Sequence, residues 1–311
     1  MALNVTKSTE LIEVKTLCFT IYSQPGLGKT SLAFTSKNPL LFDFDKGAHR
    51  SSNRKDVVQV NDWGDVANVN EADISAYDTI IIDTVGKALD SLSADIIRSN
   101  SRFAYGGALN QQGWGQLGVR FSAYLKRLRS FGKDVVLISH MDEKHDGDLI
   151  KERLKIQGGS KDLILTDSDV IARISVYNKL RHLVFSPTET SFGKDPANFV
   201  SMQLPESSDP TYHDCLSNIF KQIKDKMNAM TEGQIEALSE RQWFIDNLPK
   251  VMDADGINDI LGRSKKAGTD CQRLLVKRAR EIGLEFDADA MKYVYLDEYK
   301  YEPNFDESEA S

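Results

Sequence analysis

Residues 22–33 read Tyr-Ser-Gln-Pro-Gly-Leu-Gly-Lys-Thr-Ser-Leu-Ala, and they constrain the fold of this chain more than any other segment. The preceding residues 16–22 are apolar and β-branched, as in a strand, and residues 31–36 have the character of a helix start. A strand, a glycine-rich turn and a Lys-Thr pair at the start of a helix form a P-loop, which binds nucleotide phosphates. The segment therefore predicts a nucleotide site between one strand and one helix.

Each part of this loop has an expected role. Backbone N–H groups and the positive end of the helix dipole would face the β-phosphate. Lys29 would add a positive charge beside the β- and γ-phosphates, and the Thr30 hydroxyl would ligate Mg²⁺. The loop departs from G-x-x-x-x-G-K-[ST] at Ser23, which costs little if that position does not need a positive φ. We expect ATP and Mg²⁺ as ligands, bound by Ser23, Gln24, Pro25, Gly26, Leu27, Gly28, Lys29, Thr30 and Ser31.

Strand-like and helix-like segments alternate through the first two thirds of the chain. The expected strands are apolar runs at residues 16–22, 39–45, 77–83 and 134–140, and helical patterns occur between them at residues 85–97 and 117–131. Such alternation predicts an α/β fold with a mostly parallel sheet and right-handed crossovers. Residues 169–176 and 180–187 would close the sheet as an antiparallel pair of strands.

Three polar residues stand at the carboxyl ends of these strands, where such sheets bind ligands. Asp83 would hold Mg²⁺ directly or through water, or else cap a helix. Asp45 would orient or deprotonate the attacking water, or else belong to a plain turn. His140 would contact the γ-phosphate, or else be a strand-end histidine with a structural role. Together with Lys29, these three are the expected catalytic residues.

Composition restricts the class of protein. With 311 residues, 41% of them hydrophobic and 27% charged, we expect a soluble globular protein of about two domains. No apolar run approaches the ~20 residues of a membrane span, and the N-terminus lacks the pattern of a secretion signal. The three cysteines are far apart, and no pair has zinc-ligand spacing. These features predict a cytoplasmic protein without membrane contact or structural metal.

Several segments resemble those of one family of ATPases. Residues 42–48 resemble the RecA-family strand whose last acid activates water, and residues 81–89 are similar to that family's Walker B run. Residues 135–140 correspond to the strand that ends in its Gln or His sensor, and the pair Gly158-Gly159 matches the glycines after its second DNA-binding loop. The similarity spans about residues 15–205. Within the family, the chain resembles the phage-encoded ATPases of the Sak class of single-strand annealing proteins.

The resemblance implies a RecA-like core that hydrolyses ATP and acts on single-stranded DNA in phage recombination or annealing. It implies the cytoplasm of a bacterial host as the location. It also implies a single-strand-binding protein or another recombination protein as a partner. A homo-oligomer is compatible with it, but the sequence does not distinguish a ring, a filament and a monomer. A lone core followed by a short helical region is the organisation of that group.

Two segments occupy the positions of the family's DNA-binding loops. Aromatic side chains among the glycines of residues 99–118 would stack on unpaired bases, or else pack within a surface loop. Alternating basic residues within residues 145–159 would share one side of an extended chain and follow a phosphate backbone, or else flank a solvated hairpin. The expected DNA contacts are Arg102, Trp114, Lys151, Arg153 and Lys155.

The net charge of −7 argues at first against nucleic acid. Six acids and one base fall within residues 297–311, however, so most of the negative charge belongs to the end of the chain. Two basic clusters stand out in the rest, at residues 126–133 and 144–155. A solvated face is the default explanation for each cluster.

The pattern becomes helical after a polar linker at residues 205–210. Apolar residues recur at helical spacing over residues 216–227, and Thr231 with Gln234 has the form of a capping box that opens another helix. Two further helices are expected at residues 255–267 and 270–282. The expected division is a RecA-like P-loop ATPase domain at residues 1–205, a small helical domain at 211–285 and an acidic tail at 286–311, with 297–311 disordered or loosely docked.

Functions of three classes fit these features. The first is an ATP-dependent protein that binds or anneals single-stranded DNA. The second is a nucleotide-dependent interaction switch without DNA binding, which recruits partners through the helical domain and tail. A third, a small-molecule or nucleotide kinase, is disfavoured because no arginine-rich lid follows the P-loop core. DNA binding that depends on residues 99–118 and 145–159 would separate the first from the second.

Overall fold

The computed structural model describes residues 5–7, 10–147, 149–157 and 159–296. The chain divides into two compact units by its internal contacts. The core unit is Val14–Met227, and the C-terminal unit comprises the described residues from Asn228 onward with those of Met1–Glu13. No described helix is both long enough and apolar enough to cross a membrane.

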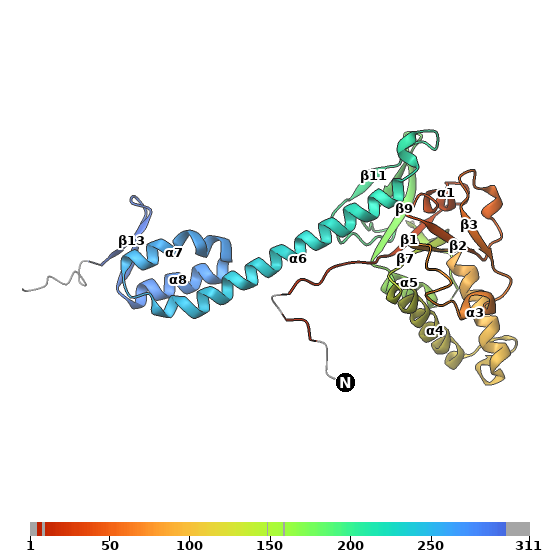
Figure 1. Ribbon diagram of the computed structural model, residues 1–311, viewed down its shortest axis with the longest axis horizontal. Helices are drawn as coiled ribbons and strands as arrows, with labels where there is room; N and C mark the ends of the chain where they lie inside the picture. The colour runs from red at the N-terminus through yellow and green to blue at the C-terminus, as the bar shows by residue number, and fades with distance from the viewer. Residues whose placement is uncertain (1–4, 8–9, 148, 158, 297–311) are drawn as a thin grey trace, which may run out of the picture. The chain divides into compact units, whose positions relative to one another are not determined.

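A mixed sheet forms the centre of the core unit, with strand order β11-β10-β9-β1-β7-β4-β2-β3 (Figure 1). The strands are β1 (Cys18–Ser23), β2 (Pro39–Asp43), β3 (Asp56–Gln59), β4 (Thr79–Asp83), β7 (Asp134–Asp146), β9 (Val170–Tyr177), β10 (Leu180–Val184) and β11 (Ser201–Gln203). All neighbours from β9 to β3 in this order are parallel, whereas β10 pairs antiparallel with β9 and β11. The predicted α/β class, its mostly parallel sheet and its closing antiparallel pair are confirmed.

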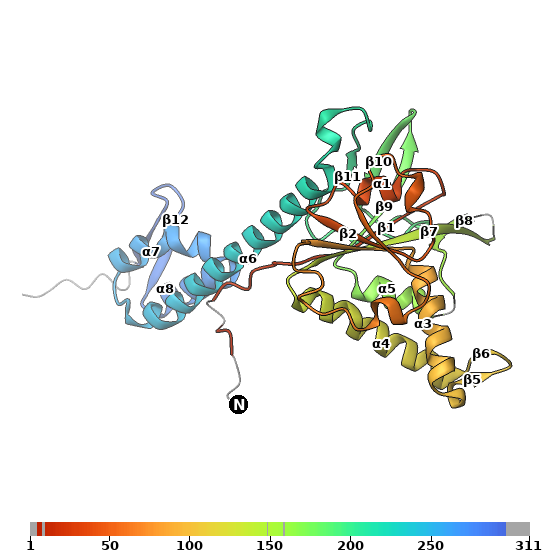
Figure 2. The same ribbon diagram turned by 45° about the vertical axis from the view of Figure 1, so that its right-hand side comes forward.

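Helices cover both faces of this sheet (Figure 2). They are α1 (Lys29–Ala33), α2 (Gly64–Ala67), α3 (Val85–Ser99), α4 (Gln111–Ser130), α5 (Ser160–Asp167) and the start of α6 (Cys215–Asn247). Side chains alternate along β1, so Cys18 and Tyr22 enter the core beneath α3 and α4, whereas Phe19 and Ile21 enter the core beneath α1 and α6. A strand buried on both faces explains the continuous apolar run in the sequence.

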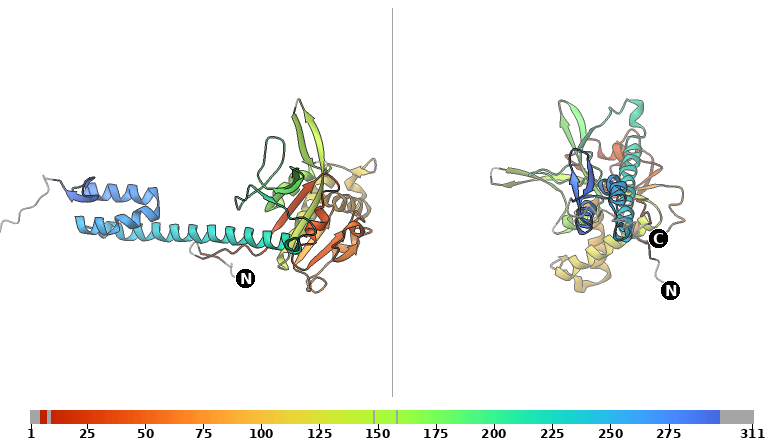
Figure 3. Two further views of the ribbon diagram at one scale, coloured as in Figure 1. Left: turned by 90° about the horizontal axis from the view of Figure 1, so that it is seen from above. Right: turned by 90° about the vertical axis from the view of Figure 1, so that its left-hand side faces the viewer.

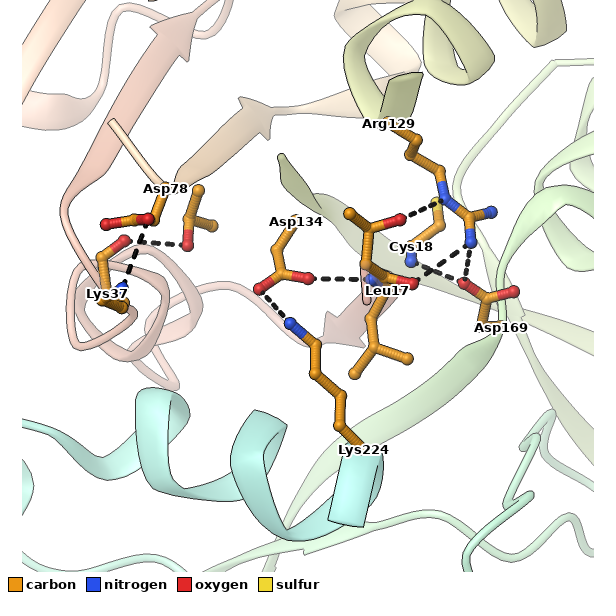
Figure 4. A network of polar contacts seen from close by, with 10 residues as sticks. Leu17, Cys18, Lys37, Asp78, Arg129, Asp134, Asp169 and Lys224 are labelled. Atoms are coloured by element: carbon orange, nitrogen blue, oxygen red, sulfur yellow. Dashed lines mark hydrogen bonds and ion pairs between the residues drawn. The ribbon is translucent and has the colours of Figure 1, made fainter. Parts of the chain in front are cut away.

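Two carboxylates, one buried and one partly buried, fix the amino ends of the central strands (Figure 4). Asp134 accepts a hydrogen bond from the Leu17 backbone N–H at 2.8 Å and one from Lys224 of α6 at 2.8 Å. Asp169 accepts the Cys18 N–H at 2.8 Å and pairs with Arg129 at 2.9 Å. Because these groups hold the register of β1, β7 and β9 at one edge, the carboxyl ends at the other edge are presented in a fixed alignment.

The prediction that residues 99–118 form a loop is wrong. The chain makes a 3₁₀ turn η2 (Ser101–Phe103) and a short hairpin of β5 (Ala104–Tyr105) and β6 (Ala108–Leu109), and α4 then begins at Gln111. The Asn110 side chain caps this helix by accepting the Gly113 N–H at 2.9 Å. A Cβ at Gly113 would lie 2.4 Å from the Phe103 carbonyl oxygen, so this glycine permits close packing rather than a loop.

Strand β7 continues beyond the sheet to Asp146 and returns as β8 (Leu149–Leu154), which pairs antiparallel with it. We call this hairpin, residues 141–155, the arm; it projects from the rest of the core unit in the right panel of Figure 3. Residues 145–159, predicted as a loop, thus include the whole of β8. Gly158 of the predicted glycine pair lies outside the described residues, and Gly159 precedes α5.

The predicted domain limits differ from those observed. Helix α6 is continuous through Thr231, so the expected helix start there is wrong; the chain from 215 to 247 contains no proline to end the helix. Its first half belongs to the core unit because Leu216 and Ile223 are buried against the sheet. Thr35, just after α1, accepts the Leu216 and Ser217 N–H groups at 2.9 and 3.1 Å.

The C-terminal unit contains the end of α6, a 3₁₀ turn η4 (Leu248–Lys250), α7 (Ala254–Ala267), α8 (Thr269–Glu281) and a hairpin of β12 (Leu284–Asp287) with β13 (Lys292–Tyr295). The two predicted helices are confirmed. A tail beginning at residue 286 is not, because Leu284 and Tyr293 bury their side chains in the small core of this unit. Residues 297–311 of the predicted tail lie outside the described residues.

Candidate nucleotide-binding site

The P-loop connects the end of β1 to the start of α1. Gly26 and Gly28 have φ values of 82° and 83°, a conformation that favours glycine. Ser23 is not among the residues with positive φ, so its replacement of the usual first glycine imposes no backbone strain, as expected. A Cβ at Gly28 would lie 2.7 Å from Nη1 of Arg181 in β10, whereas nothing lies within 4 Å of one at Gly26.

The Lys29 ammonium is buried at the base of the loop, with 6% of the residue exposed. It donates to the carbonyl oxygens of Ser23 and Gln24, each at 3.0 Å, and to the Ser23 hydroxyl at 3.2 Å. Burial lowers its pKa to about 8, although the carboxylates of Asp83 and Asp45 oppose this shift. The loop therefore holds the lysine at the position from which it can turn toward a phosphate.

Thr30 and Asp83 present two oxygen ligands side by side. The Thr30 hydroxyl donates to the Asp83 carboxylate at 2.6 Å. Burial raises the pKa of Asp83 to about 6, although the hydrogen bond from Thr30 and the positive charge of Lys29 oppose this shift. A magnesium ion keeps several waters and takes few protein ligands besides phosphate oxygens, so a hydroxyl and a carboxylate fit it well. Among the described residues, no group of three or more His, Cys, Asp or Glu could hold a metal by itself.

The segment after β2 brings a third carboxylate to the site. Asp45 donates its backbone N–H to the Asp83 carbonyl at 3.0 Å, which places it next to the end of β4. Buried Asp43 accepts the N–H groups of Gly47 and Ala48, both at 3.0 Å, and so fixes the turn that follows. The Asp45 carboxylate contacts the guanidinium of Arg50 at 3.4 Å.

His140 stands where β7 leaves the sheet. Burial lowers its pKa and the positive charge of Lys29 lowers it further, so the imidazole is neutral at physiological pH. Its Nδ1 is buried and has no hydrogen-bond partner among the described residues. A neutral ring with an unused nitrogen can accept from water or, in the other tautomer, donate to a phosphate oxygen.

These side chains surround one cavity of about 460 Å³. All four predicted catalytic residues line it, and so do six of the nine predicted nucleotide contacts. The lining residues are Pro25, Gly26, Gly28, Lys29, Thr30, Ser31, Asp45, Gly47, Arg50, Ser51, Asp83 and His140. Ser23 lies beneath Lys29, Gln24 lines a neighbouring cavity, and Leu27 packs on the core. Sequence reasoning missed Arg50, whose only signal is its position three residues after the Gly47 turn.

The predicted DNA contacts lie on different elements and differ in exposure. Arg102 is exposed on η2, and Lys151 and Arg153 lie in β8 of the arm. Lys155 follows β8 and lines a cavity of about 400 Å³ together with His140. Trp114 is in the first turn of α4 and packs against the main core, so it is poorly placed to stack on a base. Tyr105, which was not predicted, is 86% exposed at the β5–β6 hairpin.

One family of known proteins matches the segment that contains this site. The family described as an AAA domain matches residues 15–197. No curated protein matches the chain. The crystal structure of the RadB recombinase is similar over 54% of this chain and 79% of that one, with 14% identity and a TM-score of 0.34. A prototypical ATPase from the type III secretion system of pathogenic bacteria is similar over 51% of each chain, with 10% identity and a TM-score of 0.36.

The family match covers more than half of the chain and includes the loop, the strands and the carboxylates described above. The fold is a mixed α/β arrangement with a mostly parallel central sheet. This chain belongs to the AAA-domain family, and its core unit is a P-loop ATPase.

Proposed function

We propose that this ATPase acts on single-stranded DNA, in phage recombination or annealing, and that the arm carries the DNA-binding surface. The observation that supports DNA binding is the separation of charge between the two faces of the arm. The phage setting rests on the resemblance to Sak-class ATPases.

The register of the arm assigns its side chains to faces. Residues directly opposite one another in an antiparallel pair lie on the same face. One face carries the opposed pairs Asp142–Arg153 and Lys144–Lys151. The Lys155 N–H donates to the His140 carbonyl at 2.8 Å, so these two residues extend the ladder by one pair on the same face. We call this the basic face; its cations are Lys144, Lys151, Arg153 and Lys155.

The opposite face of the arm carries two acids, and both are engaged with the body of the core unit. Glu143 accepts a hydrogen bond from the Gln24 side chain at 2.8 Å, and Glu152 forms an ion pair with Arg173. The acids on the basic face are Asp142 and Asp146, of which Asp146 pairs with Lys151. Cations therefore outnumber acids on the basic face, and a phosphate backbone would meet a net positive surface.

The basic face also begins at the nucleotide site. Alternate residues along a strand are ~7 Å apart, so Lys155, Arg153 and Lys151 form a row that leads away from His140, and Lys144 lies beside Lys151 on the neighbouring strand. His140 lines both the nucleotide cavity and the cavity that contains Lys155. This arrangement supports an effect of bound nucleotide on DNA affinity.

Salt-dependent binding of single-stranded DNA tests the proposal. Affinity for a labelled oligo(dT) is measured by fluorescence anisotropy over a range of salt, with and without ATP and Mg²⁺. Replacing Lys151, Arg153 and Lys155 with Ala should flatten the log–log salt slope by about 2, since each lost phosphate contact on a single strand removes ~0.7. A matched control replaces exposed Lys37, Lys126 and Lys221, which changes the net charge equally outside the arm.

An equal loss of slope in both triple variants would mean that only net charge matters. Wild-type protein that hydrolyses ATP but binds no single-stranded DNA at low salt would refute the proposal and favour the interaction switch.

A further inference from the structure

We infer that Arg50 is a further catalytic residue, which supplies from within the same chain the cation that neutralises charge on the γ-phosphate during hydrolysis. It lines the nucleotide cavity together with the buried lysine and is presented by a loop of fixed conformation. The inference concerns the ATPase reaction and does not depend on DNA binding.

The backbone that carries Arg50 is held firmly. Asp43, at the end of β2, is 1% exposed and accepts two successive N–H groups of the following turn, those of Gly47 and Ala48. The 3₁₀ turn η1 (Ala48–Arg50) follows directly, and the Arg50 N–H donates to the Gly47 carbonyl at 3.0 Å. The Arg50 Cα therefore has a defined place at the cavity wall, whereas the side chain, 67% exposed, can move.

In the free protein the guanidinium lies back over Gly47. A Cβ on Gly47 would be 2.2 Å from Arg50 Nη2, so only glycine leaves room for this position. From there Nη2 contacts Asp45 at 3.4 Å, and both partners are partly exposed, with 67% and 25% of their side chains accessible. An exposed ion pair of this kind is weak, so a phosphate with several negative charges can draw the guanidinium away from Asp45.

Other cations near the loop are less suited to this role. Among the described residues that line the cavity, Arg50 is the only arginine. Lys29 is held beneath the loop by oxygens of Ser23 and Gln24. Arg181 approaches Gly28 but does not line the cavity; its guanidinium donates to the Pro205 carbonyl at 3.2 Å and lies over the Tyr212 ring.

Hydrolysis forms one bond to the γ-phosphorus and breaks another. The oxygen of a water molecule bonds to the γ-phosphorus, and the bond from that phosphorus to the bridging oxygen breaks, so the electron pair leaves with ADP. One water proton passes to the Asp45 carboxylate and then to solvent. Negative charge grows on the bridging and γ-phosphate oxygens, where the five donors of a guanidinium fit better than an ammonium. When Arg50 turns to these oxygens it also releases Asp45, which can then orient the water.

The experiment compares Arg50→Ala and Arg50→Lys with Arg54→Ala, an exposed arginine of the same segment that does not line the cavity. Single-turnover hydrolysis without DNA should fall by roughly 10³-fold in Arg50→Ala, in the range found for arginine fingers, and stay at the wild-type rate in Arg54→Ala. Arg50→Lys should recover part of the loss, because it restores the charge without the fork.

Two further readouts separate this role from a structural one. Arg50→Ala should bind a non-hydrolysable ATP analogue roughly tenfold more weakly and bind ADP unchanged, a comparison that needs no turnover. Mixing Arg50→Ala with Lys29→Ala should leave both chains inactive. Recovery of hydrolysis in the mixture would show that the arginine acts on a neighbouring chain. Hydrolysis at the wild-type rate in Arg50→Ala alone would exclude a catalytic role for this residue. Either result overturns the inference.

Discussion

Replacing Asp83 with Asn should stabilise the protein in the absence of nucleotide and Mg²⁺, although it removes a residue needed for hydrolysis. The carboxylate is buried at the end of β4, and within the described part of the chain it accepts one hydrogen bond from a side chain, that of Thr30, at 2.6 Å. The amide oxygen of Asn can accept the same hydrogen bond. The substitution therefore removes the buried charge and keeps the contact.

The size of the effect follows from the pKa of Asp83, which burial raises from 3.8 to about 6. The folded state holds this proton more tightly than the unfolded state, so the protein loses stability as the pH rises from about 4 to about 6. Above about pH 6 the ionised carboxylate lowers the free energy of unfolding by about 3 kcal/mol relative to an uncharged group. The gain from Asp83→Asn should have that size at neutral pH and nearly vanish near pH 4.

Urea denaturation in EDTA measures this gain. A Trp243→Phe background removes the tryptophan of the C-terminal unit, so fluorescence reports Trp63 and Trp114 in the core unit. Asp43→Asn is the matched control. The Asp43 carboxylate accepts two N–H groups, one on each oxygen, and an Asn side chain has a single oxygen to accept them. The control substitution should therefore destabilise the core unit. A gain for Asp83→Asn that is the same at both pH values, or a loss at neutral pH, would refute the reasoning.

Three other predictions concern the loop and the proposed DNA surface. Burial lowers the pKa of Lys29 to about 8, so nucleotide binding near that pH should take up about half a proton. Calorimetry in buffers of different ionisation enthalpy should detect this proton uptake, and identical binding heats in all buffers would contradict it. Gly28→Ala should reduce thermal stability more than Gly26→Ala, since both have positive φ but only the methyl at Gly28 meets a guanidinium; equal losses would argue against that contact. Tyr105→Ala should weaken binding of single-stranded DNA by about 1–3 kcal/mol without loss of stability, because its exposed ring can stack on a base. Trp114→Ala should instead lower the free energy of unfolding by roughly 3 kcal/mol in urea denaturation, because its ring packs on the core. The reverse outcome would restore Trp114 as the stacking residue.

The sequence was sufficient to predict the parallel strands and the phosphate loop because both depend on local pattern. A strand buried on two faces needs an uninterrupted apolar run, as at residues 79–83, and a P-loop needs glycine at fixed offsets. The meeting of Asp45, Asp83 and His140 in one cavity follows from the rule that parallel strands deliver their carboxyl ends to one edge.

The remaining features depend on contacts between distant segments. Glycines at 113 and 115 suggested a loop, but the Asn110 cap and the close approach to Phe103 make the segment helical. The position of Arg50 depends on how Asp43 folds the turn after β2, which no periodicity reveals. The alternation of Lys151, Arg153 and Lys155 was visible in the sequence, whereas the partnership of Lys144 with them requires the register of β7 against β8.

The register of the arm also limits how this part of the chain can change in length during evolution. Adding one residue to β7 between His140 and Glu143 would move every later side chain of that strand to the other face, and Glu143 would come to lie among the cations. Adding two residues to each strand would lengthen the arm and keep the basic face intact. Relatives of this protein should therefore vary in arm length by even steps in each strand, or carry a bulge wherever an odd step has occurred.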